Sequence, residues 1–348
     1  GQLKNLGDIY KMKKQKILII GGAGFIGHNL AIKLKKLKYN VSIVDSLQIN
    51  NIIWLKKNKN QLPFPKLSLA ILKERFELLK KSKIPLLKVD VRDYKKLSKV
   101  FKKVNPSIVI HLAAVSHANK SNKDPFSTFD HSFRTLENSL DNAKNKQFNV
   151  KRFIFLSSSM IYGNFKNKIV KESDECNPIG IYAALKLSGE HIIKAYNQVF
   201  NLPYTIIRPS ALYGERCISR RVGQIFIENI INGKEITIQG DGKEKLDFTY
   251  IEDLVDGIIC SIKSKKAENQ TFNLTYGKGQ QINKLIFFLK KNFKNVKVKY
   301  IKRDKLMPKR GTLSTFKSKN LINYRPKWPL HKGYQRYIDW YKNSYFKS

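Results

Sequence analysis

The chain has 348 residues, of which 42% are hydrophobic, enough to bury the core of one large domain or two modest ones. Its 67 Lys and Arg outnumber 26 Asp and Glu, giving a formal net charge of +41. Because the lysines are spread along the sequence and the aromatic residues do not alternate with them in an RNA-binding pattern, we expect mostly solvated surface and no nucleic-acid partner. A functional basic surface remains the alternative.

Residues 1–11 lack an apolar signal core, and we expect them to form an N-terminal tail. No apolar run is long enough to span a bilayer, so no membrane association is expected. The three scattered cysteines, Cys176, Cys217 and Cys260, give neither a disulfide framework nor metal-ligand spacing. This predicts a cytoplasmic protein without a metal site.

The first predicted element is a strand that runs directly into a glycine-rich turn. Four large apolar residues, 17–20, fit a strand buried on both faces of a parallel sheet. The sequence GGAGFIG follows, in which glycines permit a tight turn and the apolar residues begin a helix. Unpaired N–H groups at such a helix start favour an anion, here a dinucleotide pyrophosphate. We therefore predict a cofactor site at Gly21, Gly24, Phe25, Ile26 and Gly27, the alternative being a turn without a ligand.

A second strand, 41–44, ends at Asp45, about twenty residues beyond the glycines. A carboxylate at this place accepts hydrogen bonds from the adenosine ribose and repels a 2′-phosphate. Asp45 therefore predicts NAD rather than NADP. A long connection follows, 46–85, in which apolar spacing predicts a helix over 67–81. Such a connection caps the cofactor site or forms a partner surface, and the sequence favours neither.

Further strands are predicted at 86–89, 107–110, 153–156 and 204–208, with helices at 129–145 and 180–200 between them. This alternation is typical of an α/β fold, a Rossmann-type doubly wound parallel sheet. Residues after two strand ends are placed to contact the cofactor. Asp90 and Val91 are expected beside adenine, and the small residues within Leu112, Ala113 and Ala114 would allow the protein backbone to lie against the cofactor.

Beyond residue 207 the alternation loosens, although helices are predicted at 251–262, at 282–292 and ending near 338–341. We predict an NAD-binding domain over 12–207, to which 247–265 returns. The remainder of 208–348 is predicted to form a smaller, irregular α/β domain that binds the substrate.

The sharpest chemical pattern is Tyr182-Ala-Ala-Leu-Lys186, which places a phenol and an ammonium on one helix face. The positive charge is expected to lower the pKa of Tyr182 and make it a general base. Ser158, at a strand's carboxyl end, is expected to bond the reacting sugar oxygen, with Ser157 and Ser159 as alternatives.

The motifs GGAGFIG, HLAA, SSSMIYG, YAALK, RPSALYGER and GDGKEKLDFTYIEDL occur in an order that resembles the extended short-chain dehydrogenase/reductases. The likeness is to the nucleotide-sugar epimerase/dehydratase branch, typified by UDP-glucose 4-epimerase. It implies that bound NAD+ takes a hydride from C4 of a nucleotide hexose while Tyr182 removes the hydroxyl proton. The 4-ketose then turns and receives the hydride on its other face. It also implies a homodimer formed through the helices at 129–145 and 180–200.

Departures from the family pattern favour some reactions over others. Ser159 and Met160 stand where 4,6-dehydratases carry an acidic pair, which disfavours dehydration and decarboxylation. Three further positions of the pattern hold Ala211, Leu246 and Ser132, and the Arg of the C-terminal R-x-G-D motif is Lys309. We therefore expect a remodelled substrate pocket. Its predicted residues are Ser158, Ser159, Met160, Arg216, Arg221, Lys309 and Arg310, with Arg220 as a further candidate for the diphosphate.

The sequence thus predicts an NAD-dependent nucleotide-sugar epimerase, an isomerase of carbohydrate metabolism and polysaccharide biosynthesis that acts at C4. The closest alternative is an NAD(P)H-dependent reductase or dehydrogenase of the same substrates. A non-catalytic protein that binds NAD or nucleic acid is a third, which the joint presence of Ser158, Tyr182 and Lys186 disfavours.

Overall fold

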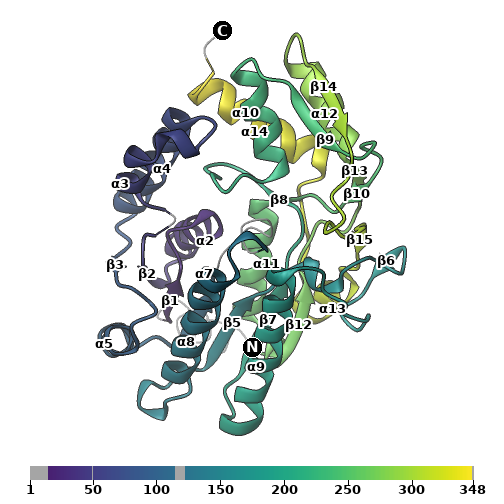
Figure 1. Ribbon diagram of the computed structural model, residues 1–348. Coiled ribbons are helices and arrows are strands. Elements are labelled where there is room, and N and C mark those ends of the chain that lie inside the picture. Colours follow the sequence, from purple (N-terminus) through teal and green to yellow (C-terminus); the bar gives the residue numbers. More distant parts are fainter. Residues whose placement is uncertain (1–14, 49, 114–121, 347–348) are drawn as a thin grey trace, which may run out of the picture.

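The computed structural model describes residues 15–48, 50–113 and 122–346, and a parallel sheet of seven strands forms its centre (Figure 1). The strands lie side by side in the order β3-β2-β1-β4-β5-β7-β12, and every adjacent pair is parallel. Their bounds are β1 Lys16–Ile20, β2 Asn40–Asp45, β3 Leu86–Lys88, β4 Ile108–His111, β5 Arg152–Leu156, β7 Tyr204–Arg208 and β12 Gln270–Asn273. The strand order reverses between β1 and β4, the position at which such sheets bind ligands beyond their carboxyl ends.

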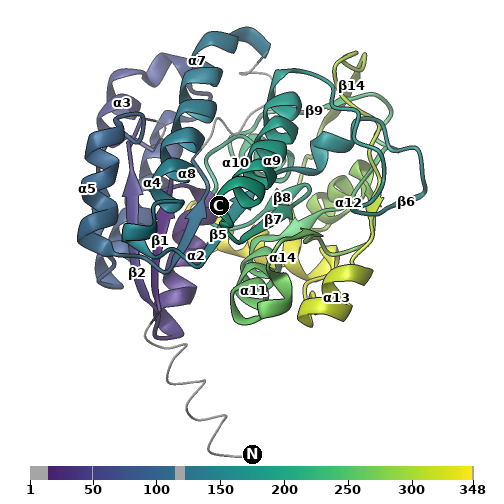
Figure 2. The same ribbon diagram turned by 90° about the horizontal axis from the view of Figure 1, so that it is seen from below.

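Both faces of this sheet are buried, which explains why its strands are continuously apolar. Along β1, Ile17 and Ile19 join one hydrophobic cluster, while Leu18 and Ile20 join another. Helices α2 (Phe25–Lys36) and α11 (Ile251–Lys263) contribute to the first cluster. Helices α5 (Tyr94–Val104), α8 (Thr135–Ala143) and α9 (Ile181–Phe200) contribute to the second, and Figure 2 shows α8 and α9 across the sheet from α2 and α11. The predicted Rossmann-type doubly wound fold is confirmed.

The predicted helices are present, and the structure adds detail to two regions. The helix expected within the connection 46–85 is α4 (Pro65–Lys81), preceded by α3 (Ile52–Lys57) and the 3-10 turn Lys59–Gln61. The helix expected over 129–145 is interrupted, because α7 (Pro125–Phe129) continues as the π-helical turn Asp130–Arg134 before α8 begins. A π-helical turn of this kind often occurs at functional sites.

The rest of the chain forms the less regular region in the upper part of Figure 1. Its helices are α10 Val222–Ile231, α12 Ile282–Asn292, α13 Phe316–Ile322 and α14 Leu330–Ser344. Four two-stranded pairs accompany them: β6 Ile169–Val170 with β15 Thr312–Leu313, β8 Leu212–Tyr213 with β11 Thr249–Tyr250, β9 Ile236–Gln239 with β14 Val298–Ile301, and β10 Lys245–Leu246 with β13 Gln280–Gln281. Strand β12 pairs with β7 of the large sheet, although it lies beyond the segment 247–265 expected to return there. Within the described ranges, no helix is long and apolar enough to cross a membrane.

Candidate functional site

The glycine turn after β1 has the shape that a bound pyrophosphate requires. Gly21 has φ +79°, and a Cβ added there would lie 2.6 Å from the Ala113 nitrogen. A Cβ on Gly27 would lie 2.5 Å from the Gly22 Cα, so packing within the protein explains both glycines. A Cβ on Gly24 would meet nothing closer than 3.6 Å. Gly24 begins α2, which no side chain caps, so its missing side chain leaves the helix start open to an anion.

Asp45 lies at the end of β2 and holds the glycine turn in place. Its two carboxylate oxygens accept hydrogen bonds from the N–H groups of Ala23, at 3.0 Å, and Leu47, at 2.8 Å. Burial raises the pKa of Asp45, and these two donors together with Arg75 oppose the rise. Each carboxylate oxygen has a second lone pair, so the side chain keeps the capacity to accept ribose hydroxyls.

Arg75 of α4 is a site residue that sequence reasoning missed. Its side chain is fully buried and donates to the Ala23 carbonyl at 3.0 Å, the Asn50 Oδ1 at 2.8 Å and the Arg216 carbonyl. The connection 46–85 therefore packs against the glycine turn. Because the chain has 67 Lys and Arg residues, nothing in the sequence distinguishes Arg75 from the others.

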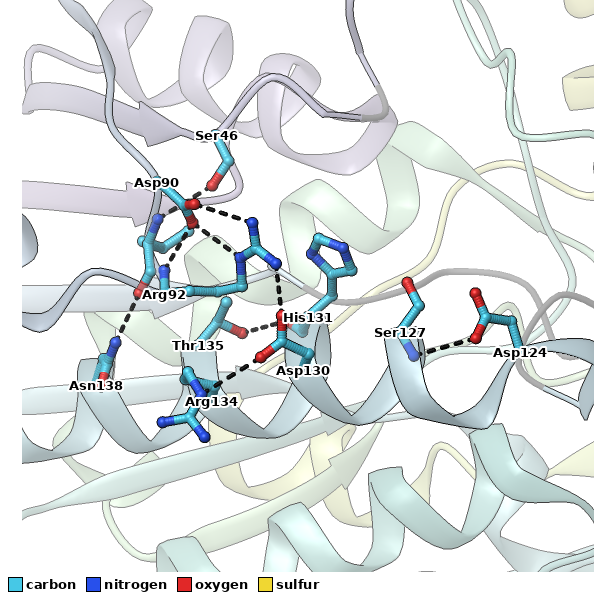
Figure 3. A network of polar contacts seen from close by, with 11 residues as sticks. Ser46, Asp90, Arg92, Asp124, Ser127, Asp130, His131, Arg134, Thr135 and Asn138 are labelled. Carbon is cyan, nitrogen blue, oxygen red and sulfur yellow. Dashed lines mark hydrogen bonds and ion pairs between the residues drawn. The ribbon is translucent and has the colours of Figure 1, made fainter.

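Of the predicted adenine contacts, Asp90 lies in the polar network of Figure 3, and Val91 follows it in the chain. Arg92 donates to the Asp90 carboxylate from Nε, at 3.1 Å, and from Nη2, at 3.0 Å, and it also contacts Asp130. Arg92 therefore holds the pKa of Asp90 below its ordinary value. The Val91 N–H donates to the Ser46 hydroxyl at 3.1 Å, and its carbonyl accepts from Asn138 at 3.0 Å. These bonds fix the backbone after β3.

A small cavity lies between the end of β4 and the helices α7 to α9 and encloses about 350 Å³, including space open to solvent. Its lining includes Ala113, Ser132, Tyr182 and Lys186. His111 also lines it, and burial together with the Lys186 charge lowers the pKa of His111 to about 3, so this imidazole stays neutral. The Leu112 N–H bonds the Ile20 carbonyl at 2.8 Å, while the predicted contact Ala114 lies outside the described residues.

Tyr182, Ser158 and Lys186 meet at one edge of this cavity. The Ser158 side chain is near enough to the Tyr182 hydroxyl to favour its phenolate, and the Ser158 Oγ accepts the Met160 N–H at 3.0 Å. The Lys186 Nζ donates to the Leu156 carbonyl at 2.8 Å and lies 5.8 Å from the centroid of the Tyr182 ring. The predicted triad is thus brought together.

The structure gives the three adjacent serines different partners. Ser157 bonds the Glu190 carboxylate, and the Ser159 hydroxyl accepts from Arg310 at 2.9 Å. Of the three serines, only Ser158 is among the groups that lower the pKa of Tyr182. This favours Ser158 over the two alternatives that the sequence left open.

The electrostatics around Tyr182 differ from expectation. Burial raises the pKa of Tyr182, and the opposing influences are Arg221, the Ser158 hydrogen bond and Arg310. The expectation that Lys186 lowers the pKa was therefore wrong for the protein chain by itself. Burial lowers the pKa of Lys186 to about 8, because an ammonium loses its hydration there, although the Glu190 charge opposes this.

A network of one ion pair and several hydrogen bonds surrounds Glu190, close to the triad. Glu190, one helical turn after Lys186, forms an ion pair with Arg208 at 2.6 Å, and both side chains are at most 5% exposed. Arg208 also donates to the Tyr162 hydroxyl at 3.0 Å, which in turn donates to Asn273 at 2.7 Å. The network links α9, β7 and β12, so it fixes the end of β5 on which the serines lie.

A second, larger cavity opens on the other side of Tyr182 and encloses about 1960 Å³, including space open to solvent. Tyr182 is common to the linings of both cavities. Among the predicted substrate residues, those that line the larger cavity are Ser158, Met160, Arg221 and Arg310, together with Arg220 and the two departure positions Ala211 and Leu246. Ala211 has φ +41°, a conformation that Asn adopts more readily than Ala.

Three predicted substrate residues are absent from this lining: Ser159, which is fully buried and bonds Arg310, and Arg216 and Lys309, which lie elsewhere. The Arg216 guanidinium donates to His28 at 2.9 Å and Asn29 at 2.8 Å on α2, so it supports the cofactor helix. Lys309 is exposed, and its backbone N–H bonds Asn164 at 2.7 Å. Neither is among the residues that line the larger cavity, and we do not carry them into the substrate site.

Comparisons with known proteins show which family and fold this chain resembles. The model of the NAD dependent epimerase/dehydratase family matches residues 17–275. UDP-glucuronate 4-epimerase of Thermodesulfobacterium geofontis is 29% identical over 94% of this chain and 96% of its own length. UDP-glucuronic acid 4-epimerase of Bacillus cereus, solved with UDP-glucuronic acid and NAD, is 27% identical with a TM-score of 0.83, covering 95% of this chain and all of that one. UDP-glucose 4-epimerase of Thermotoga maritima, solved with UDP-glucose, is 26% identical with a TM-score of 0.82, covering 94% of this chain and 99% of that one.

Proposed function

The chain belongs to the NAD-dependent epimerase/dehydratase family, and from that premise we propose that it is a nucleotide-sugar 4-epimerase. The observation that carries the proposal is the position of Tyr182, which lies near Ser158 and lines both cavities. A base in that position reaches a sugar hydroxyl in the larger cavity, which Ile26 at the start of α2 also lines. The UDP-sugar 4-epimerases among its relatives support the same reaction.

NAD is the cofactor, and the residues around the glycine turn fit it. We propose that the start of α2 at Gly24, Phe25 and Ile26 holds the pyrophosphate, that Asp45 binds the adenosine ribose, and that Lys186 binds the nicotinamide ribose. Once bound, NAD supplies the hydride acceptor and donor that epimerisation at C4 requires.

The proton chemistry falls to the protein. Tyr182 accepts the proton of the C4 hydroxyl through its phenol oxygen, and Ser158 bonds the same sugar oxygen and orients it. Arg221 and Arg310 favour the phenolate form of Tyr182, as would the positive charge of an oxidised nicotinamide ring. The 4-keto sugar then turns, and Tyr182 returns the proton to the oxygen after the other face has been reduced.

Dehydration requires a second acid–base pair at the sugar, which Ser159 and Met160 do not supply. Ser159 is fully buried and bonded to Arg310, and Met160 has no titratable group. These two positions support epimerisation over dehydration within the family.

The test incubates the purified protein with pairs of UDP-, GDP-, CDP- and dTDP-sugars that differ at C4 and follows them by NMR without added cofactor. Interconversion of a pair supports the proposal. Turnover only with a stoichiometric supply of NADH or NADPH favours a reductase. Absence of turnover, with salt-dependent binding of RNA or DNA, would favour a binding protein.

We also propose a homodimer formed through the helices at 129–145 and 180–200. Large apolar side chains are exposed near this face: Phe126 is 86% exposed, Phe129 50%, Val199 69% and Phe200 42%. A second copy would bury them. Light scattering coupled to size-exclusion chromatography should give twice the chain mass, and a monomer at all concentrations would contradict the proposal.

A further inference from the structure

Arg310 enters the larger cavity without an acidic partner. Among the described residues, the hydrogen bonds of its side chain come from Nη2 alone, to the hydroxyls of Ser159 at 2.9 Å and Ser210 at 2.8 Å. Its Nε is buried and has no partner. Among the described residues, no carboxylate forms an ion pair with this guanidinium.

Two carboxylates, Glu244 and Asp247, favour the positive charge of Arg310, but both are bonded to other groups. Glu244 accepts the Arg310 backbone N–H at 3.5 Å, but its carboxylate pairs with Arg303 at 2.9 Å. Asp247 is fully buried and accepts four hydrogen bonds, from Thr275, Gly277, Lys278 and Leu313. Both therefore attract Arg310 without filling its hydrogen-bonding capacity.

A second cation of the same kind lies nearby. Arg221 also lines the cavity, has a buried Nε without a partner, and lies 5.8 Å from the centroid of the Phe25 ring. Its charge disfavours the charge of Arg310. Two such guanidiniums cost free energy unless a ligand supplies negative charge. A nucleotide sugar always supplies one anionic group, the diphosphate on carbon 1.

The position of Arg310 indicates where the second anionic group lies. Ser159, which Arg310 bonds, directly follows Ser158, and the Ser158 side chain lies near the Tyr182 hydroxyl. Arg310 is therefore beside the reacting end of the sugar, near carbon 4. In a pyranose ring carbons 3 and 5 adjoin carbon 4, whereas carbon 1 lies across the ring. Carbon 6, attached to carbon 5, is the carbon of a hexose that oxidises to a carboxylate without opening the ring, so an anion bound by Arg310 belongs there.

We propose that Arg310, held in place by Ser159 and Ser210, binds a carboxylate on carbon 6, so that the substrate is a nucleotide-linked hexuronic acid. The inference rests on the proposed function, since it takes Tyr182 as the group that acts at carbon 4. The guanidinium offers the planar, charge-assisted hydrogen bonds that a carboxylate prefers, and the Ser210 hydroxyl, which also lines the cavity, adds a donor.

The test compares kcat/KM for matched pairs that differ only at carbon 6, such as UDP-glucuronic acid and UDP-glucose, and the corresponding dTDP and GDP pairs. The wild-type protein should prefer the uronic acid by about ten- to a hundredfold, the effect of a hydrogen bond to a charged group. Arg310→Gln should remove most of this preference, and Arg310→Lys should keep part of it. Lys302→Gln, with the same loss of charge at an exposed position, is the matched control and should leave the preference unchanged.

Three outcomes would overturn the inference. One is a wild-type preference for the neutral hexose, which leaves the epimerase proposal intact. Another is a preference that Arg310→Gln does not change. The third is an Arg310→Gln variant that binds nucleoside diphosphate alone more weakly and loses both sugars equally, which assigns Arg310 to the diphosphate. If no pair turns over, the epimerase proposal fails, and calorimetric binding of the same pairs still decides whether the uronic acid is preferred.

Discussion

Arginines near helix α9 fall into two groups that differ in how they are paired. Arg208 is buried and paired with Glu190 at 2.6 Å, and its remaining nitrogen, Nη1, reaches the Tyr162 hydroxyl and the Glu172 carbonyl, each at 3.0 Å. Arg221 and Arg310 are half-buried, face the larger cavity and form no ion pair with a carboxylate of the described residues.

This difference separates a structural cluster from a ligand-directed one. A buried charge whose donors are all used fixes the elements around it, because every movement breaks a bond. A half-buried charge with a buried, unused donor raises the energy of the protein alone and is stabilised when an anion arrives. Tyr182 lies between the two clusters, and the unpaired cations are the ones that favour its phenolate.

Removing the phenol itself should give the largest effect. Tyr182→Phe takes away the proposed proton acceptor and leaves both clusters in place, so kcat should fall by about 10²–10⁴-fold. The thermal midpoint and the amount of NAD that co-purifies should stay near the wild-type values. Turnover at the wild-type rate in this variant would remove Tyr182 from the mechanism.

Breaking the paired cluster should mainly affect stability. Glu190→Gln leaves the Arg208 charge buried without its counter-ion, which should lower the free energy of unfolding by about 3–5 kcal/mol in denaturant titration. The double variant Glu190→Gln, Arg208→Met removes both charges and should recover much of this loss. A single variant as stable as the wild type would show that the pair does not hold the fold.

The same charge removal in the unpaired cluster should cost little. Arg310→Gln loses two hydrogen bonds to neutral hydroxyls but also relieves the unfavourable interaction with Arg221, so the free energy of unfolding should fall by less than about 3 kcal/mol. A loss as large as that of Glu190→Gln would mean that Arg310 belongs to the structural framework, and the distinction between the clusters would fail.

The sequence predicted the large sheet, its flanking helices and the proximity of Tyr182 to Ser158 because these depend on local patterns. Continuous apolar strands, a glycine turn and the i, i+4 spacing of Tyr182 and Lys186 are read directly from neighbouring residues. Strand β12 was missed, since QTFN has no alternating or continuous apolar pattern and forms a strand only by pairing with β7.

Charge–charge relations were harder to predict, because they depend on residues far apart in the chain. Arg75 reaches the glycine turn from 52 positions away, and Arg310 reaches Ser159 across 151. The expected role of Lys186 on the pKa of Tyr182 failed for the same reason. Spacing along a helix gives proximity, but burial and the distant Arg221 and Arg310 determine the electrostatics.

The smallest predicted effect concerns pH and tests both clusters through one group. The pKa of Lys186 is lowered to about 8, so its ammonium loses its proton as the pH rises through that value, and kcat/KM should decline there. Glu190 raises this pKa and Arg221 lowers it. The decline should therefore begin at lower pH in Glu190→Gln and at higher pH in Arg221→Gln, whatever the maximum rate of each variant. Lys186→Arg, whose guanidinium keeps its charge, should abolish the decline. Shifts in the same direction in both variants would show that the two clusters do not act oppositely on Lys186.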